Sequence, residues 1–137
     1  KAPDFKAKNP DGNEVSLMQN LGSKVTVVDF WASWCRPCRI ENPNMVALYN
    51  DFKDKGLSMI GVSLDQEGTD QAWKDAIAQD NLTWTHVSNL KFWNDPIAVL
   101  YNVKSIPAVF ILDAKGIIVA KNIRGAELRA KVAELTK

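Results

Sequence analysis

The 137-residue chain is poor in the residues from which several common kinds of site are built. It has only two cysteines, too few for the framework of several disulfides that holds small secreted domains together. Its single histidine, His86, brings the nitrogen and sulfur ligands to three, whereas a structural zinc site takes about four. No run approaches the roughly 20 apolar residues of a membrane-spanning helix. With a formal net charge of +1, nothing points to nucleic acid or to an anionic membrane surface as a partner.

The composition is that of one ordinary globular domain. Hydrophobic residues make up 46% of the chain and charged residues 24%. A chain of 137 residues is long enough to bury a real core but suits a single domain. No repeat or low-complexity segment interrupts it, so we expect residues 1–137 to form one unit.

Both cysteines lie in one short stretch, Trp-Cys-Arg-Pro-Cys, at residues 34 to 38. The apolar, β-branched residues 25–30 before it predict a buried strand. Behind it, apolar residues recur at helical spacing and predict a helix over about 36–55, with a kink at Pro43. The cysteines therefore mark the place where a strand ends and a helix begins.

That position has chemical consequences for the two thiols. Free N–H groups and the macrodipole at a helix N-terminus favour an anion, so Cys35 should ionise more readily than a free cysteine and should reach solvent. Residues three apart in a helix share a face, so Cys38 can close a small disulfide with Cys35. We interpret Cys35 as the nucleophile and Cys38, one turn deeper, as the resolving thiol. The stretch predicts a site that makes and breaks one disulfide.

The rest of the chain reads as alternating strands and helices. Residues 1–24 contain a strong turn signal and predict an N-terminal β-hairpin. A strand at 57–64 should run parallel to 25–30 through a right-handed crossover. Later segments are expected as a helix around 72–77, a strand at 83–87, a helix at 95–101, a hairpin of strands 108–112 and 117–120, and a last helix ending near 135.

Four segments together resemble a known family. They are residues 28 to 39 (Val-Asp-Phe-Trp-Ala-Ser-Trp-Cys-Arg-Pro-Cys-Arg), Pro43, residues 105 to 108 (Ser-Ile-Pro-Ala) and residues 2 to 5 (Ala-Pro-Asp-Phe). In this order the chain resembles the thioredoxin superfamily, and within it the TlpA/ResA-like thiol-disulfide oxidoreductases of bacteria. The resemblance implies a thioredoxin-like α/β fold, a central mixed β-sheet flanked by helices.

The resemblance also implies how the domain is organised. The hairpin at 1–24 would be an extension of the fold, and residues 65–104 would be a TlpA-type central insertion that adds a helix and about one strand. Such domains often form the C-terminal part of longer chains, and this one is a candidate for the same arrangement.

Two acidic residues enter the expected site through the resemblance. An acid six residues before the first cysteine relays the proton of the buried cysteine in thioredoxin-like proteins, and Asp29 holds that place in a strand where burial should raise its pKa. Its alternative is a structural hydrogen-bonding role. Glu41 matches a glutamate that influences the thiols in ResA-like proteins; its alternative is an ordinary solvated helix residue.

Five further residues are expected to bind the substrate. Trp34 should shape the contact surface, and Pro37 should start the helix cleanly. Arg36 would either lower the pKa of the neighbouring thiol or point into water, where its charge is screened. Pro107 matches the family's cis-proline, which exposes the backbone of Ile106 to a docking strand; the alternative is an ordinary trans proline.

The remaining tryptophans are expected to pack in the interior. Trp31 should lie beneath the site, and core packing is the expectation for Trp73, Trp84 and Trp93 in the added region. A place for Trp93 on the rim of the substrate groove is the alternative. His86 is expected to be a strand residue without a catalytic part.

These residues predict thiol-disulfide exchange with protein substrates, with no cofactor and no metal beyond the cysteine pair itself. The resemblance implies a reducing role outside the cytoplasm, with a membrane tether elsewhere in the protein. Expected partners are disulfide- or dithiol-containing proteins and an upstream redox donor, and we expect a monomer. Two alternatives stay open: a peroxiredoxin-like peroxidase, although its Pro-x-x-x-Thr/Ser-x-x-Cys signature is missing around Cys35, and a copper- or zinc-binding module that uses the cysteine pair.

Overall fold

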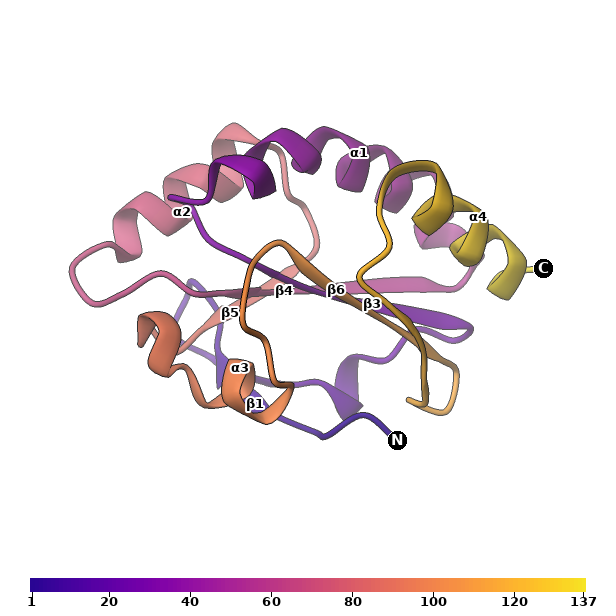
Figure 1. Ribbon diagram of the computed structural model, residues 1–137, viewed down its shortest axis with the longest axis horizontal. Helices are drawn as coiled ribbons and strands as arrows, with labels where there is room; N and C mark the ends of the chain where they lie inside the picture. Colours follow the sequence, from indigo (N-terminus) through magenta and orange to yellow (C-terminus); the bar gives the residue numbers. More distant parts are fainter.

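The molecule is built on one mixed sheet of seven strands (Figure 1). The computed structural model describes all 137 residues. Along the sheet the strands follow the order β2-β1-β5-β4-β3-β6-β7. β3 runs parallel to β4, and β4 parallel to β5, while the other neighbours are antiparallel. The strands are β1 (Lys6–Lys8), β2 (Glu14–Ser16), β3 (Val25–Trp31), β4 (Leu57–Ser63), β5 (Thr85–Ser88), β6 (Ala108–Asp113) and β7 (Ile118–Lys121).

Four α-helices cover the sheet. Figure 1 shows α1, α2 and α4 on one face, and α3 on the other face beside the N-terminal hairpin. Three short 3-10 helices complete the fold, and no helix is both long and apolar enough to cross a membrane. The helices are α1 (Arg36–Phe52), α2 (Asp70–Gln79), α3 (Pro96–Leu100), α4 (Gly125–Leu135), η1 (Met18–Asn20), η2 (Lys53–Lys55) and η3 (Phe92–Asn94).

The central strand and the helix that follows it set the position of the cysteines. All seven residues of β3 are buried, because strands flank it on both sides and helices cover both faces. α1 buries the stripe of Met45, Leu48 and Phe52 against the sheet. The helix was expected to reach about residue 55, but its α-helical part ends at Phe52, and the last turn is the 3-10 helix η2 before Gly56 at φ +105°. Such a backbone favours glycine and ends the helix.

The predicted fold class, an α/β fold with a central mixed sheet flanked by helices, is confirmed. The sheet is mixed, β3 lies parallel to β4 and antiparallel to β6, and β1 pairs with β2 as a hairpin. This hairpin is part of the central sheet, since Lys8 of β1 pairs with Ser88 of β5. Residues 65–104, which were expected to be an insertion, hold the helices α2 and α3, the strand β5 and the 3-10 helix η3.

Candidate active site

A disulfide between Cys35 and Cys38 lies at the N-terminus of α1. Cys35 is the N-cap residue with an extended backbone, and Arg36 and Pro37 form the first turn with Cys38. The Cα atoms of the two cysteines are 5.3 Å apart. The backbone N–H of Cys38 donates a hydrogen bond to Cys35 Sγ at 3.2 Å, so this sulfur occupies the place of a capping oxygen. Once reduced, the same position favours a thiolate at Cys35.

The structure holds the disulfide form, whereas the expectation that Cys35 reaches solvent concerned its thiolate. In the disulfide, Cys35 exposes 4% of its surface and Cys38 2%, so the two are nearly equally buried. Cys35 Sγ is bonded to Cys38 Sγ in this form. The same sulfur lies 3.9 Å from the carbonyl oxygen of Ile106, on the loop before β6.

A cavity of about 30 Å³ lies beneath the disulfide. Asp29 from β3, Cys38 and Glu41 from α1, and Pro107 at the start of β6 all line it. A cavity of this volume is large enough to admit one water molecule between polar groups. The tertiary structure therefore brings the two expected acidic residues, Asp29 and Glu41, to the same cavity as the expected resolving cysteine, Cys38.

Asp29 is buried and exposes only 4% of its surface. Burial raises its pKa from 3.8 to about 7, and the nearby charge of Glu41 adds to the increase. Asp29 lies between Gly61 of β4 and Val109 of β6 in the sheet, which explains its removal from water. A carboxyl group with a pKa near 7 can both take up and release a proton at neutral pH.

Glu41 links α1 to α4 as well as lining the cavity. Its Oε2 accepts a hydrogen bond from the backbone N–H of Gly125, the first residue of α4, at 3.2 Å. Its Oε1 accepts one from Nδ2 of Asn44 at 3.1 Å. A carboxylate at a helix N-terminus interacts favourably with the macrodipole. Glu41 is thus half-buried and bonded, unlike a freely solvated helix residue.

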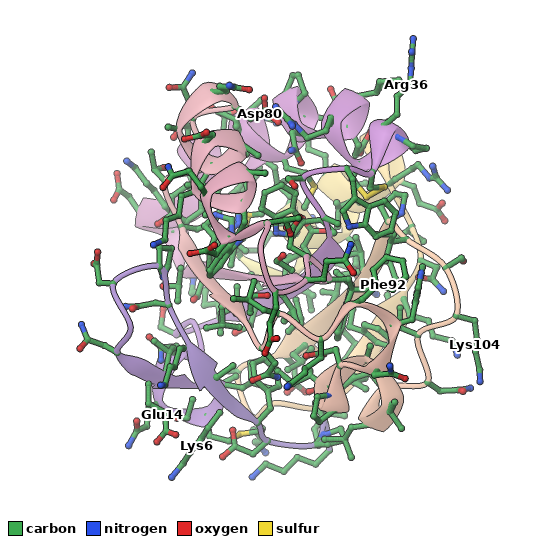
Figure 2. The ribbon with its side chains drawn as sticks, turned by 90° about the vertical axis from the view of Figure 1, so that its left-hand side faces the viewer. Lys6, Glu14, Arg36, Asp80, Phe92 and Lys104 are labelled. Carbon is green, nitrogen blue, oxygen red and sulfur yellow. A yellow bond between two sulfur atoms is a disulfide. The ribbon has the colours of Figure 1, made fainter.

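The expected substrate-binding residues lie around the disulfide in two groups. Trp34 is 46% exposed next to Cys35, and the Ile106–Pro107 bond on the opposite side is cis, the isomer that the resemblance implied. Pro37 is exposed in the first turn of α1. Figure 2 shows Arg36 projecting away from the protein, which is the second of its two expected orientations.

Sequence reasoning missed the residues that hold the active-site loop. The backbone N–H and the hydroxyl of Ser33 both donate to the carboxylate of Asp65, at 3.2 and 2.5 Å. Asp65 is fully buried just after β4 and also accepts a 2.5 Å hydrogen bond from the Ser63 hydroxyl. The sequence carried one signal for it, a carboxylate directly after a buried apolar strand.

The carbonyl of Ser33 is held from the other side by α1. Arg39 donates to it from Nη1 at 3.0 Å and also forms a two-point ion pair with Asp80, at the C-terminus of α2. Burial alone would raise the pKa of Asp80, but hydrogen bonds from Arg39 and Asn42 and the charge of Arg39 lower it. Ser33 lies two residues before Cys35, and its backbone N–H, its carbonyl and its hydroxyl all form hydrogen bonds.

Of the tryptophans expected in the interior, one is partly exposed in the structure. Trp31, Trp73 and Trp84 are buried as expected, but Trp93 is 36% exposed, so the prediction of core packing was wrong for it. Trp93 belongs to η3, and its ring lies beside those of Trp34 and Phe92, where it stays partly exposed. His86 is buried against Trp31 and Trp84, and burial lowers its pKa to about 4. No three His, Cys, Asp or Glu residues are grouped as ligands for a metal ion.

The fold and the site together define a thioredoxin-like protein with a disulfide at the start of the helix that follows its central strand. Over residues 1–121 the chain matches the AhpC/TSA family, and it belongs to that family. It is 37% identical over 118 residues to the thioredoxin-like protein YneN of Bacillus subtilis, covering 85% of this chain and 66% of YneN. It is 30% identical over 136 residues to the thiol-disulfide oxidoreductase ResA of Bacillus cereus, covering 99% of this chain and 75% of ResA.

Solved structures agree with this assignment. A thiol-disulfide oxidoreductase from Bacteroides fragilis superposes with a TM-score of 0.89 at 32% identity, covering 98% of both chains. The thioredoxin domain of a thiol-disulfide oxidoreductase from Bacteroides vulgatus gives 0.88 at 34% identity, covering 99% of this chain and 95% of that one. These three relatives are named thiol-disulfide oxidoreductases or a domain of one, and this chain holds a Cys35–Cys38 disulfide.

Proposed function

We propose that this protein is a thiol-disulfide oxidoreductase that reduces disulfides in other proteins through the Cys35–Cys38 pair. The observation that carries the proposal is the position of this pair. One sulfur caps the N-terminus of α1, and the other cysteine lines a cavity with the carboxyl group of Asp29. The relatives named thiol-disulfide oxidoreductase support the same activity.

In the first step the reduced protein attacks a substrate disulfide. The Cys35 thiolate forms a bond to one substrate sulfur, the substrate S–S bond breaks, and the other substrate sulfur leaves as a thiolate that takes up a proton. The free N–H groups of the first turn of α1 stabilise the attacking thiolate. The product of this step is a mixed disulfide between Cys35 and the substrate.

In the second step Cys38 resolves the mixed disulfide. Its thiol passes its proton to the Asp29 carboxylate across the cavity, directly or through a water molecule. The resulting thiolate attacks Cys35 Sγ, the Cys35–Cys38 bond forms and the bond between Cys35 and the substrate sulfur breaks. The substrate sulfur leaves as a thiolate and takes up a proton, so the substrate is released as a dithiol. Two electrons have moved to the substrate, and a dithiol donor protein must return two electrons to close the cycle. Burial is the main cause of the raised pKa of Asp29, and the negative charge of Glu41 would raise this pKa further.

The edge next to Pro107 would hold the substrate backbone. The carbonyl of Ile106 lies 3.9 Å from Cys35 Sγ, so a peptide that pairs with this edge has its sulfur close to Cys35. Trp34, Arg36 and Pro37 would line the other side. The cysteine pair would be the only redox group, and no further cofactor is required.

The setting follows from the resemblance to ResA-like proteins. We place the activity outside the cytoplasm, with partners that are disulfide-containing proteins and an upstream dithiol donor, and with any membrane tether outside these 137 residues. The chain would act as one monomeric domain, with the hairpin and residues 65–104 as additions to the thioredoxin core.

The peroxidase alternative has little support at the site. Its signature would require proline seven residues before Cys35 and threonine or serine three residues before it. Those positions hold Val28 and Ala32, both fully buried. The hydroxyl that the signature places at residue 32 is therefore absent.

Trapping of the mixed disulfide tests the proposed function. The Cys38→Ser variant, reduced and then mixed with insulin as a disulfide-bonded protein, should form an adduct on non-reducing gels that disappears with dithiothreitol. The matched Cys35→Ser variant should form none, because the remaining Cys38 lines the cavity and lacks the N-cap position that favours a thiolate. Equal trapping by both variants, or by neither, would contradict these roles.

A further inference from the structure

Three exposed aromatic side chains meet beside the disulfide. Trp34 contacts Phe92 with ring centroids 5.4 Å apart and Trp93 at 6.3 Å, while Phe92 and Trp93 are 6.0 Å apart. Their exposed fractions are 46%, 37% and 36%. We call these three residues the aromatic surface. Figure 2 shows Phe92 at the side of the molecule on which Arg36 also lies.

This exposure is unusual within the chain. Single exposed apolar residues are normal, but neighbouring large rings exposed together mark a contact site for another molecule. The other three tryptophans are buried. Leu90 and Phe92 have φ of +55° and +54°, in the left-handed region that bulky side chains rarely adopt. The backbone at Phe92 thus has a conformation that does not suit its residue type, and its ring is partly exposed.

The aromatic surface comes from two segments, the loop that carries Trp34 and the helix η3 that carries Phe92 and Trp93. Asp65 forms hydrogen bonds with both segments. The side chain of Asp65 holds Ser33, which directly precedes Trp34. The backbone carbonyl of Asp65 accepts a hydrogen bond from the N–H of Phe92 at 3.2 Å. The loop before α1 and the start of η3 are therefore tied to the same point at the end of β4. A surface fixed in advance loses less conformational entropy when a partner binds.

We propose that the aromatic surface docks the residues that flank the reacting cysteine of a protein substrate. This inference rests on the proposed function and specifies its substrates. In the mixed disulfide the substrate sulfur is bonded to Cys35, so neighbouring substrate residues must lie against Trp34, the preceding residue. Aromatic and large apolar side chains suit such a surface, because stacked rings add to the area that they bury.

The charges beside the aromatic surface specify the substrate further. Arg36 and Lys104 are exposed, and neither forms an ion pair within this chain. Arg36 directly follows Cys35, and Lys104 lies two residues before Ile106, whose carbonyl oxygen is 3.9 Å from Cys35 Sγ. Figure 2 labels both on the same side of the molecule as Phe92. Acidic groups on the partner would complement these charges. The substrate segment is therefore a cysteine with an aromatic and an acidic residue next to it.

The test compares short peptides in which a single cysteine forms a disulfide with glutathione. One peptide carries tyrosine and glutamate beside the cysteine, a second alanine and glutamate, and a third tyrosine and glutamine. The second-order rate constant for reduction by the dithiol form of the protein is measured for each. Hydroxyethyl disulfide, too small to reach the aromatic surface while reacting, supplies the rate by which each peptide rate is divided.

The variants are Phe92→Asn, which suits a left-handed backbone, and Trp93→Ser. The matched control is Ile118→Ser on β7. Ile118 is also 37% exposed, but it pairs with Leu112, which in turn pairs with Thr26 near the start of β3. It therefore lies toward the opposite end of the sheet from the cysteines. Its substitution removes an exposed apolar side chain without touching the aromatic surface.

The parent should favour the tyrosine–glutamate peptide over the alanine–glutamate peptide by about tenfold. Phe92→Asn and Trp93→Ser should lose most of this preference, and Ile118→Ser should keep it. The tyrosine–glutamine peptide should react more slowly than the first peptide, and added salt should remove that difference. Equal rates with all three peptides in the parent, or an equal loss in Ile118→Ser, would overturn the inference. A parent that reduces neither the peptides nor hydroxyethyl disulfide would instead contradict the proposed function itself.

Discussion

The buried carboxylate of Asp65 holds Ser33, 32 residues earlier in the chain, through both its hydroxyl and its backbone N–H. This contact connects the end of β4 to the loop that carries Cys35. Arg39 holds the carbonyl of the same serine. The position of Cys35 thus depends on hydrogen bonds made two residues before it, by groups that never touch a sulfur atom.

We expect Asp65→Asn to slow the alkylation of Cys35. The NH2 group of asparagine would face the N–H and hydroxyl groups of Ser33 and Ser63, which are donors themselves, so the loop before Cys35 would lose hydrogen bonds. Stability should also fall, by about 1–3 kcal/mol. The measurement is the rate of iodoacetamide alkylation of Cys35 in the reduced variant, with the free energy of unfolding determined alongside. Asp95→Asn is the matched control, since Asp95 is equally buried but caps α3. A similar change in alkylation rate in both variants would make Asp65 a purely structural residue.

Asp29→Asn should slow the resolution of the mixed disulfide while leaving its formation intact. The amide fills the same space but cannot accept the proton of Cys38. Since the pKa of Asp29 is about 7, resolution in the parent should accelerate as the pH rises through about 7, and the variant should lack this step. Stopped-flow measurement of both steps from pH 5 to pH 9 checks the prediction. An unchanged pH profile would leave Asp29 with a structural role.

The same substitution should stabilise the oxidised protein at high pH. The pKa of Asp29 is about 7 in the folded protein and near 3.8 when unfolded, so the folded state binds more protons between these values. The free energy of unfolding of the parent should therefore decrease, relative to Asp29→Asn, as the pH rises from about 4 to about 7. The difference above pH 7 should amount to a few kcal/mol. Urea denaturation at pH 4 and pH 8 tests this, and a parent that gains stability over the variant at pH 8 would contradict it.

Glu41→Gln should lower the pKa of Asp29. Burial is the main reason why this pKa is high, but the charge of Glu41 contributes, and glutamine removes it. The step in the resolution rate should therefore move to lower pH. Glu127→Gln is a suitable control, because Glu127 lies in the first turn of α4, the helix that Glu41 contacts through Gly125, but does not line the cavity. An identical profile in Glu41→Gln and the parent would show that the two carboxyl groups do not interact.

Some tertiary features could not be read from the chain. Core packing was the expectation for Trp93, because tryptophan is highly buried on average. In the structure its ring is partly exposed beside Trp34. The orientation of Arg36 was undecided, since a residue in the first turn of a helix can face either the site or water. Its side chain points away from the protein (Figure 2).

By itself the sequence determined the strand that precedes the cysteines, the helix that begins at them and the disulfide that joins them. These features depend on residues within a few positions of one another, and local periodicity and spacing report them directly. Only the tertiary structure decided that Asp29, Cys38 and Glu41 share one cavity, that Asp65 holds Ser33, and that three aromatic rings meet on the surface. Burial and electrostatic shifts arise where segments far apart in the chain pack together, and no local pattern encodes which segments these are.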